Sequence, residues 1–97
     1  MNADLVRAIE EKRLVEFVYK TARRIVEPHD YGIRGGEETL LGYQLSGRKD
    51  SGAVRGWREF KLVKLGQLRV LERTFPGSRA DSAQHHRAWD VLFARVA

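Results

Sequence analysis

The stretch that decides the fold is residues 25–65, which read IVEPHDYGIRGGEETLLGYQLSGRKDSGAVRGWREFKLVKL. Short runs of β-branched, aromatic and leucine residues alternate here with glycine-rich turns, a pattern typical of consecutive short β-strands. Gly35 and Gly36 predict a turn, and Gly42 within a strand pattern predicts the kind of bend that small barrels need. The strands expected from this stretch are 24–27, 39–45 and 57–65.

The flanking residues extend this pattern on both sides. Val15, Phe17 and Tyr19 alternate on one face of an expected strand, and Pro28 should stop or bend the strand before it. Asp4 can cap an N-terminal helix. Apolar residues of the C-terminal segment recur at i, i+3, i+4 and i+7, as in an amphipathic helix. The further elements expected are a helix at 5–12, strands at 15–19 and 67–71, and a helix at about 82–96.

The predicted architecture is a mainly β (α+β) fold in one domain, residues 1–97. Five short strands with glycine bends over about residues 15–72 predict a small β-barrel that the two helices flank or cover. With 97 residues, of which 42% are hydrophobic, the chain can bury a single compact core.

Composition excludes several classes of protein. The chain has no cysteine, so disulfides, a thiol nucleophile and cysteine-based zinc sites are excluded. No apolar run approaches the ~20 residues that span a bilayer, and the N-terminus lacks the apolar core of a signal peptide. We therefore expect a cytoplasmic protein with no membrane association.

The charge is positive and unevenly distributed. Eighteen Lys and Arg residues stand against 13 Asp and Glu, a net charge of +5. The excess concentrates in residues 48–64, which predicts a region that binds an anion, with nucleic acid as the leading candidate. The alternative is that these cations are only solvated. The basic residues of this region are Arg48, Lys49, Arg55, Arg58, Lys61 and Lys64.

Arg58 and Lys64 are the first candidates for anion contacts. As alternate residues of one expected strand, they should share a face and flank Phe60. A guanidinium group suits bidentate phosphate contacts, and lysine supplies a compact charge. Arg55 in the preceding loop could add to an electrostatic funnel, and Arg24 could reach the same site from the second strand.

Three ring-bearing residues complete the candidate site. Trp57 is the better candidate for stacking on a base, because its face also carries charged residues. Tyr43 could stack as well, but it alternates with leucines and could instead belong to the core. His29 could titrate near neutral pH and contact a ligand, or it could be structural.

The sequence predicts no enzyme. No serine has a neighbouring His–Asp pattern, and no phosphate-binding glycine motif occurs. His85 and His86 are adjacent, so they would not share a helix face and would not form a metal pair. We expect no metal and no cofactor.

At this point the residues resemble a known family, the WYL domain. The resemblance rests on VEPH at 26–29, LLGY at 40–43 and WREFKLVKL at 57–65, with AIEEKRLV at 8–15 similar to the opening helix and first strand of the family. The chain departs from the family in two places: the Trp-Tyr-Leu triplet aligns with residues 38–40, where only the leucine is kept, and Val63 replaces an aspartate.

The resemblance implies an SH3/Sm-like β-barrel with a regulatory, ligand-sensing role, and similar modules bind single-stranded nucleic acid or nucleotides. Such domains usually stand beside a helix-turn-helix, for which too few residues precede Val15. The chain would then act alone, as a homo-oligomer or with a separate DNA-binding chain.

The expected function is a regulatory module that binds single-stranded nucleic acid or a nucleotide-like anion. The alternative is a protein–protein interaction or assembly module, in which exposed strand edges or a helix with Trp89 and Phe93 contact a partner.

Overall fold

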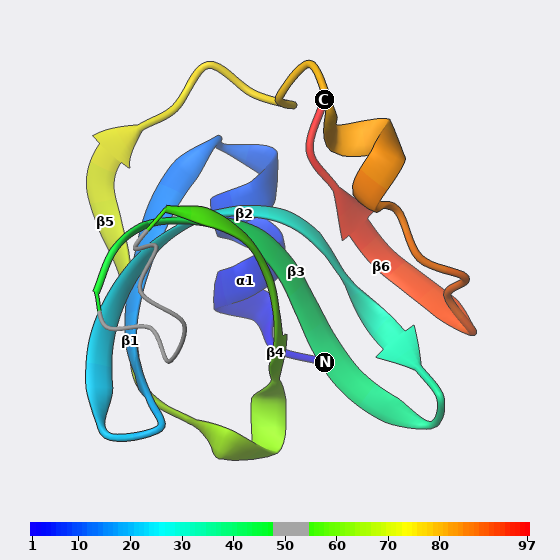
Figure 1. Ribbon diagram of the computed structural model, residues 1–97, viewed down its shortest axis with the longest axis horizontal. Helices are drawn as coiled ribbons and strands as arrows, with labels where there is room; N and C mark the ends of the chain where they lie inside the picture. The colour runs from blue at the N-terminus through cyan, green and yellow to red at the C-terminus, as the bar shows by residue number, and fades with distance from the viewer. Residues whose placement is uncertain (48–54) are drawn as a thin grey trace.

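The computed structural model describes residues 1–47 and 55–97 of the chain. It shows a mainly β domain in which a six-stranded antiparallel sheet curves around a core and is accompanied by one α-helix (Figure 1). The elements are α1 (Ala3–Glu10), β1 (Arg13–Tyr19), β2 (Ala22–Arg34), β3 (Glu37–Ser46), β4 (Gly56–Lys61), the short 3₁₀ helix η1 (Leu62–Lys64), β5 (Leu65–Thr74), the 3₁₀ helix η2 (Ser82–His85) and β6 (Val91–Arg95).

Helix α1 begins and ends earlier than the sequence predicts. Asn2, rather than Asp4, is the N-cap, and its side-chain oxygen accepts a hydrogen bond of 3.2 Å from the Leu5 N–H. The helix ends at Glu10 because Lys12 takes a left-handed backbone conformation, with φ at 55°, that turns the chain into β1. One face of the helix is buried against the sheet. The residues of that face are Leu5, Ala8 and Ile9.

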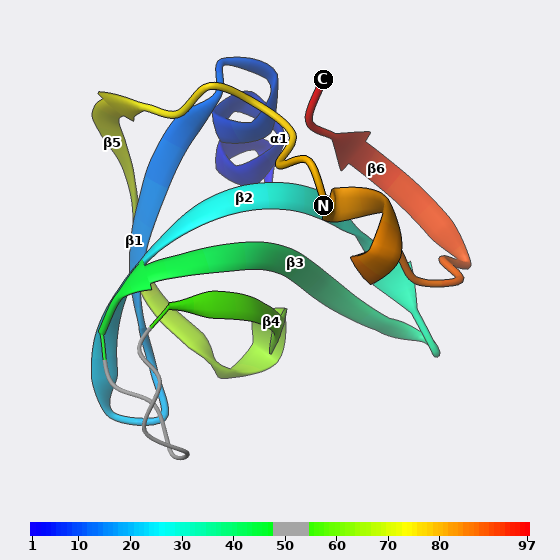
Figure 2. The same cartoon turned by 45° about the horizontal axis from the view of Figure 1, so that its top comes forward.

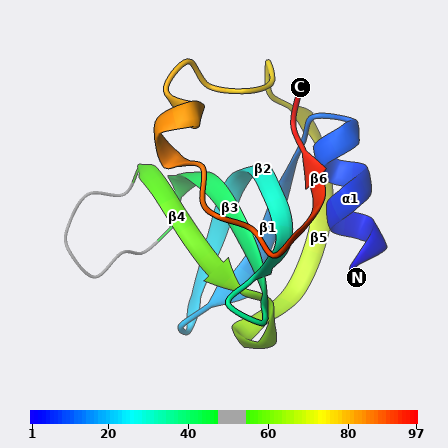
Figure 3. The same ribbon diagram turned by 90° about the vertical axis from the view of Figure 1, so that its right-hand side faces the viewer.

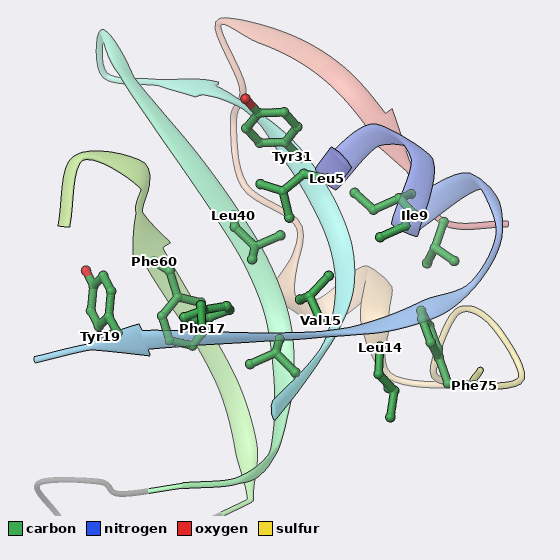
Figure 4. Close-up of a cluster of buried hydrophobic side chains, with 13 residues drawn as sticks. Leu5, Ile9, Leu14, Val15, Phe17, Tyr19, Tyr31, Leu40, Phe60 and Phe75 are labelled. Atoms are coloured by element: carbon green, nitrogen blue, oxygen red, sulfur yellow. The ribbon is translucent and has the colours of Figure 1, made fainter. Parts of the chain in front are cut away.

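The predicted alternation in β1 is confirmed. Val15, Phe17 and Tyr19 are buried inside the curve of the sheet. Phe60 of β4 lies between the two β1 rings, with centroids 4.9 Å from Phe17 and 5.1 Å from Tyr19 in edge-to-face contact (Figure 4). These rings join β4, at one end of the strand order, to β1, next to the other end, across one core, and this contact fixes the curvature of the sheet.

Strand β2 is the central strand of the fold, and of the two outcomes predicted at Pro28, a stop or a bend, the strand continues with an irregularity there. Its register against β3 shifts between Pro28 and Asp30, so the proline sits at an irregularity where the loss of its N–H is tolerated. β3 pairs along one edge of β2. On the other edge, β1 pairs with the first half of β2 and β6 with the second half (Figure 2).

The sheet is open rather than a closed five-stranded barrel. Its strands follow the order β4-β3-β2-β1-β5, and β6 is a sixth strand attached to β2. The predicted strand at 57–65 is divided, since β4 ends at Lys61 and η1 turns the chain toward β5 at the far end of the order. At this turn the Lys61 N–H donates to the Tyr19 hydroxyl.

The predicted C-terminal helix at 82–96 is wrong. Only η2 is helical there, and residues 91–95 form strand β6 beside β2 (Figure 3). In this pairing the Phe93 ring packs 5.1 Å from the Tyr31 ring, and Val96 is buried. Gly32 of β2 permits this pairing, because a side chain there would collide with the Val91 carbonyl. Strand pairing has overridden a helical spacing of apolar residues.

Candidate ligand-binding site

The structure divides the seven predicted site residues into three groups. Two lie on the inward face of the sheet, three cluster on its outer face, and two are exposed elsewhere. In that order the groups are Arg24 and Arg58; His29, Tyr43 and Trp57; and Arg55 and Lys64. The prediction therefore collected residues that do not form one surface.

Arg24 is a buried side chain that ties one end of the sheet together. It pairs with Phe17 across β1 and β2, so it points inward with the core. Its Nε and Nη2 donate to the Tyr19 carbonyl at 3.2 and 3.1 Å, and its Nη1 donates to Gln44 Oε1 at 3.2 Å. Its guanidinium carbon also lies 5.5 Å from the centre of the Tyr19 ring. Arg24 is thus held in one position.

Arg58 and Lys64 do not share a strand face, contrary to the prediction. Arg58 has the inward parity of Phe60 on β4, and its Nη1 donates to the Trp57 carbonyl at 2.8 Å. Lys64 lies in η1, beyond the end of β4, and is exposed. Arg55 is exposed immediately before β4, while Arg48 and Lys49 lie outside the described residues.

The outer face of β2, β3 and β4 carries a cluster of rings. Tyr43 pairs with Trp57 across β3 and β4, and their rings meet edge to face at 5.6 Å. The His29 ring also meets Trp57 edge to face, with ring centroids 4.7 Å apart. His85 of η2 stacks on the indole, with centroids 4.6 Å apart and an interplanar angle of 17°. Trp57 is therefore already stacked, with an imidazole from the same chain in the place that was predicted for a base.

The segment after β5 covers this ring cluster. The Arg79 guanidinium carbon lies 3.5 Å from the centre of the Tyr43 ring, and its Nε and Nη2 donate to the two carboxylate oxygens of Glu27 at 2.8 and 3.2 Å. These hydrogen bonds raise the pKa of Arg79. The Trp57 indole N–H donates to Asp81 at 3.1 Å, which lowers the pKa of that carboxyl.

His29 links the strand to this covering segment. The ring is only 2% exposed, with Nδ1 3.0 Å from the Glu27 carbonyl and Nε2 3.3 Å from the Arg79 N–H. Both contacts are satisfied by a neutral ring that carries its hydrogen on Nδ1. Burial lowers the pKa of His29 and opposes the charged form. Of the two roles considered for His29, the observed contacts are those of a structural residue.

Further arginine–carboxylate pairs fasten the C-terminal segment to the same face. Glu59 accepts from Arg87 at 2.8 Å and from Arg34 at 3.1 Å, and Asp30 accepts two hydrogen bonds of 3.0 Å from Arg95. Sequence reasoning missed all of these pairs. The sequence offered one signal for them: the arginines at 79, 87 and 95 are regularly spaced, but this spacing does not place them on one face of the helix that was predicted there.

Other site types receive no support from the described residues. Within residues 1–47 and 55–97, no group of three or more His, Cys, Asp or Glu side chains could hold a metal ion. In the same ranges, no helix has the length and apolar character needed to cross a membrane.

A scan against protein-family models, a search of curated proteins and a search of solved structures each found no match. The resemblance to WYL domains therefore stays a prediction.

Proposed function

We propose that this chain is a non-catalytic, regulatory binding module that recognises an anionic ligand, single-stranded nucleic acid or a nucleotide, at the inward basic end of the sheet. The observation that carries the proposal is the placement of Arg24 and Arg58. They extend from β2 and β4 on the inward face, on either side of β3. Arg58 is half-buried and would contact the phosphate of a ligand directly, while Arg24, which is only 6% exposed, would add its positive charge.

Rigidity and charge both support this assignment. Arg24 is fixed by its bonds to Tyr19 and Gln44, so binding would not have to order that side chain. Arg55 enters β4 next to this end of the sheet, and the chain as a whole carries a net charge of +5. Such a ligand would be held mainly by electrostatics, so its affinity would fall steeply with salt.

Fluorescence polarisation with labelled single-stranded DNA and RNA oligonucleotides across a salt series tests the proposal. Replacing Arg58 by alanine should weaken binding several-fold and reduce the salt slope by about one unit, since one phosphate contact is lost. Arg69→Ala is the matched control, because Arg69 is 70% exposed on β5 at the opposite end of the strand order and should leave binding little changed. Equal affinities for Arg58→Ala and the wild type would defeat the proposal, as would absence of binding at low salt.

A protein-interaction module is the second candidate. The observation that favours it is the outer face, where Glu27 and Tyr43 already hold an arginine from another segment of the chain. The ring cluster of His29, Tyr43 and Trp57 belongs to this second surface and is left out of the anion site.

A further inference from the structure

Residues 79–88, called the cap here, lie over the outer face of β2, β3 and β4 and are attached to it chiefly by side chains. Within the described part of the chain, the cap makes one backbone hydrogen bond that reaches the sheet, from the Arg79 N–H to the His29 ring. The hydrogen bonds of Ser82 N–H and Gln84 N–H stay inside the cap. Before the cap, Ser78 bonds Ala97, and after it the Asp90 N–H bonds the Ile33 carbonyl. The cap can therefore lift without breaking the pairing of any strand.

Glu27 and Tyr43 of the sheet form a specific contact site for Arg79, the first arginine of the cap, and such a contact site is called a seat here. Glu27 takes the Arg79 guanidinium bidentately, while the Tyr43 ring lies under its flat face. The Glu27 side chain is 8% exposed, so this carboxylate depends on a cationic partner. Lysine could not reproduce the arrangement, because only a planar guanidinium both forks onto a carboxylate and stacks on a ring.

Glu59, two residues after Trp57 in β4, forms a second seat. Glu59 receives the Arg87 guanidinium through Nε at 2.8 Å, and it also accepts from Arg34 within the sheet. Between the two seats, Trp57 stacks on the cap imidazole of His85. With the cap lifted, this face would present carboxylates and aromatic rings together, which attract guanidinium groups and repel phosphate.

We propose that the outer face of β2, β3 and β4 is a docking surface for an arginine-bearing peptide segment of a partner protein, and that the cap is its resident occupant in cis. The inference rests on the second candidate function, the protein-interaction module, and is independent of the anion-binding function because it uses the opposite face of the sheet. Its basis is charge complementarity together with the observed seating of the chain's own arginines in Glu27 and Glu59.

The cap competes with any incoming segment at the effective concentration of a tethered ligand, which is on the order of millimolar for short connections. A partner segment must therefore bind more tightly than the cap does. Removing the cap arginines from the protein, while leaving the seats intact, should expose the docking surface to a peptide added in trans.

The test uses the full chain with Arg79→Ala and Arg87→Ala, and a fluorescein-labelled peptide with the sequence of residues 77–90, GSRADSAQHHRAWD. Polarisation titrations should show this variant binding the peptide at least about tenfold more tightly than the wild type does. Adding Glu27→Gln should abolish the gain. A peptide with lysine at both arginine positions should bind several-fold more weakly, because the bidentate and stacked contacts are lost.

Three results would overturn the inference: a variant that binds no better than the wild type, equal binding of the lysine peptide, or a wild-type dimer that exchanges caps, which would make a second copy the occupant. If the double variant does not fold, Arg87→Ala alone serves, since Glu59 keeps Arg34 as a partner. That variant should bind the peptide more tightly than the wild type does, and equal binding would overturn the inference. Glu27→Gln should not change oligonucleotide binding, so failure here and failure of the anion site are read separately.

Discussion

Replacing Gly32 by alanine is expected to detach β6 from β2. A Cβ atom at this position would lie 2.1 Å from the Val91 carbonyl oxygen and 3.0 Å from the Leu92 Cα. Both are backbone atoms, so no side-chain rotation relieves the contact. Ordinary van der Waals contact begins at 3.4 Å, and 3.4 minus 2.1 leaves 1.3 Å by which the two strands would have to separate.

A separation of that size breaks hydrogen bonds of the β2–β6 pairing and loosens Phe93 and Val96 against the core. Overpacking costs about 1–3 kcal/mol, and each lost hydrogen bond adds about 1 kcal/mol. We expect Gly32→Ala to lower the free energy of unfolding by roughly 3 kcal/mol. In a domain of this size, that corresponds to a fall in Tm on the order of 15 °C.

Urea and thermal unfolding followed by circular dichroism measure this difference. Gly66→Ala is the matched control, because a Cβ at Gly66 of β5 meets nothing within 4 Å. That variant should be unchanged or up to about 1 kcal/mol more stable, since alanine loses less backbone entropy on folding. If Gly32→Ala is as stable as the wild type, β6 does not pair with β2 at this position and the reasoning fails.

Three further outcomes are expected. Burial lowers the pKa of His29 below its ordinary 6.5. As the pH falls below 6.5, His29 is therefore protonated in the unfolded chain before it is protonated in the folded chain. Stability should therefore fall as the pH drops below about 6.5, by at most about 1.4 kcal/mol per pH unit, until the folded pKa is reached; His29→Gln should flatten this dependence, and an unchanged profile would contradict it. Phe60→Ala should cost about 3–5 kcal/mol of unfolding free energy, whereas Val63→Ala, at a side chain 85% exposed, should stay within about 0.5 kcal/mol, as urea titrations would show. A double-mutant cycle on Glu27 and Arg79 should give a coupling energy of about 1–3 kcal/mol, and a value near zero would show that the arginine seat contributes nothing to stability.

The parts of the fold that the sequence predicts correctly are those with local signals. The alternation of Val15, Phe17 and Tyr19 needs only one buried face, and the turn at Gly35 and Gly36 needs only two residues that accept positive φ. Both features are determined within a few residues of the chain. A local pattern is therefore sufficient to find them.

The C-terminal strand could not be found in this way. Phe93 and Val96 have the spacing of a helix face, and nothing within the segment opposes that interpretation. The strand depends on Gly32, which lies about sixty residues earlier and leaves room for the β6 backbone. Asp30 adds a second distant condition, because it fixes Arg95 on the paired strand. Both conditions are long-range contacts that no local window contains.

The predicted site residues do not form one surface, and the reason is related. Net charge says how many cations exceed the carboxylates but not which cations are neutralised by contact. Arg79 and Arg87 lie against carboxylates of the sheet, while Lys64 falls on a turn that divides the expected strand. The prediction gave the residue types of a binding surface, and the folded chain distributes those types over separate faces.

The two proposed surfaces use groups of opposite charge to bind their ligands. The proposed inward site would use the guanidinium group of Arg58 and the charge of the buried Arg24. The proposed outer site uses the carboxylates of Glu27 and Glu59, which other arginines occupy. Added salt should weaken an oligonucleotide at the inward end steeply, because counterions are released there. It should weaken an arginine peptide less, because its partner carboxylates are largely buried and poorly screened. A comparison of the two salt slopes on one preparation would therefore assign each ligand to its face.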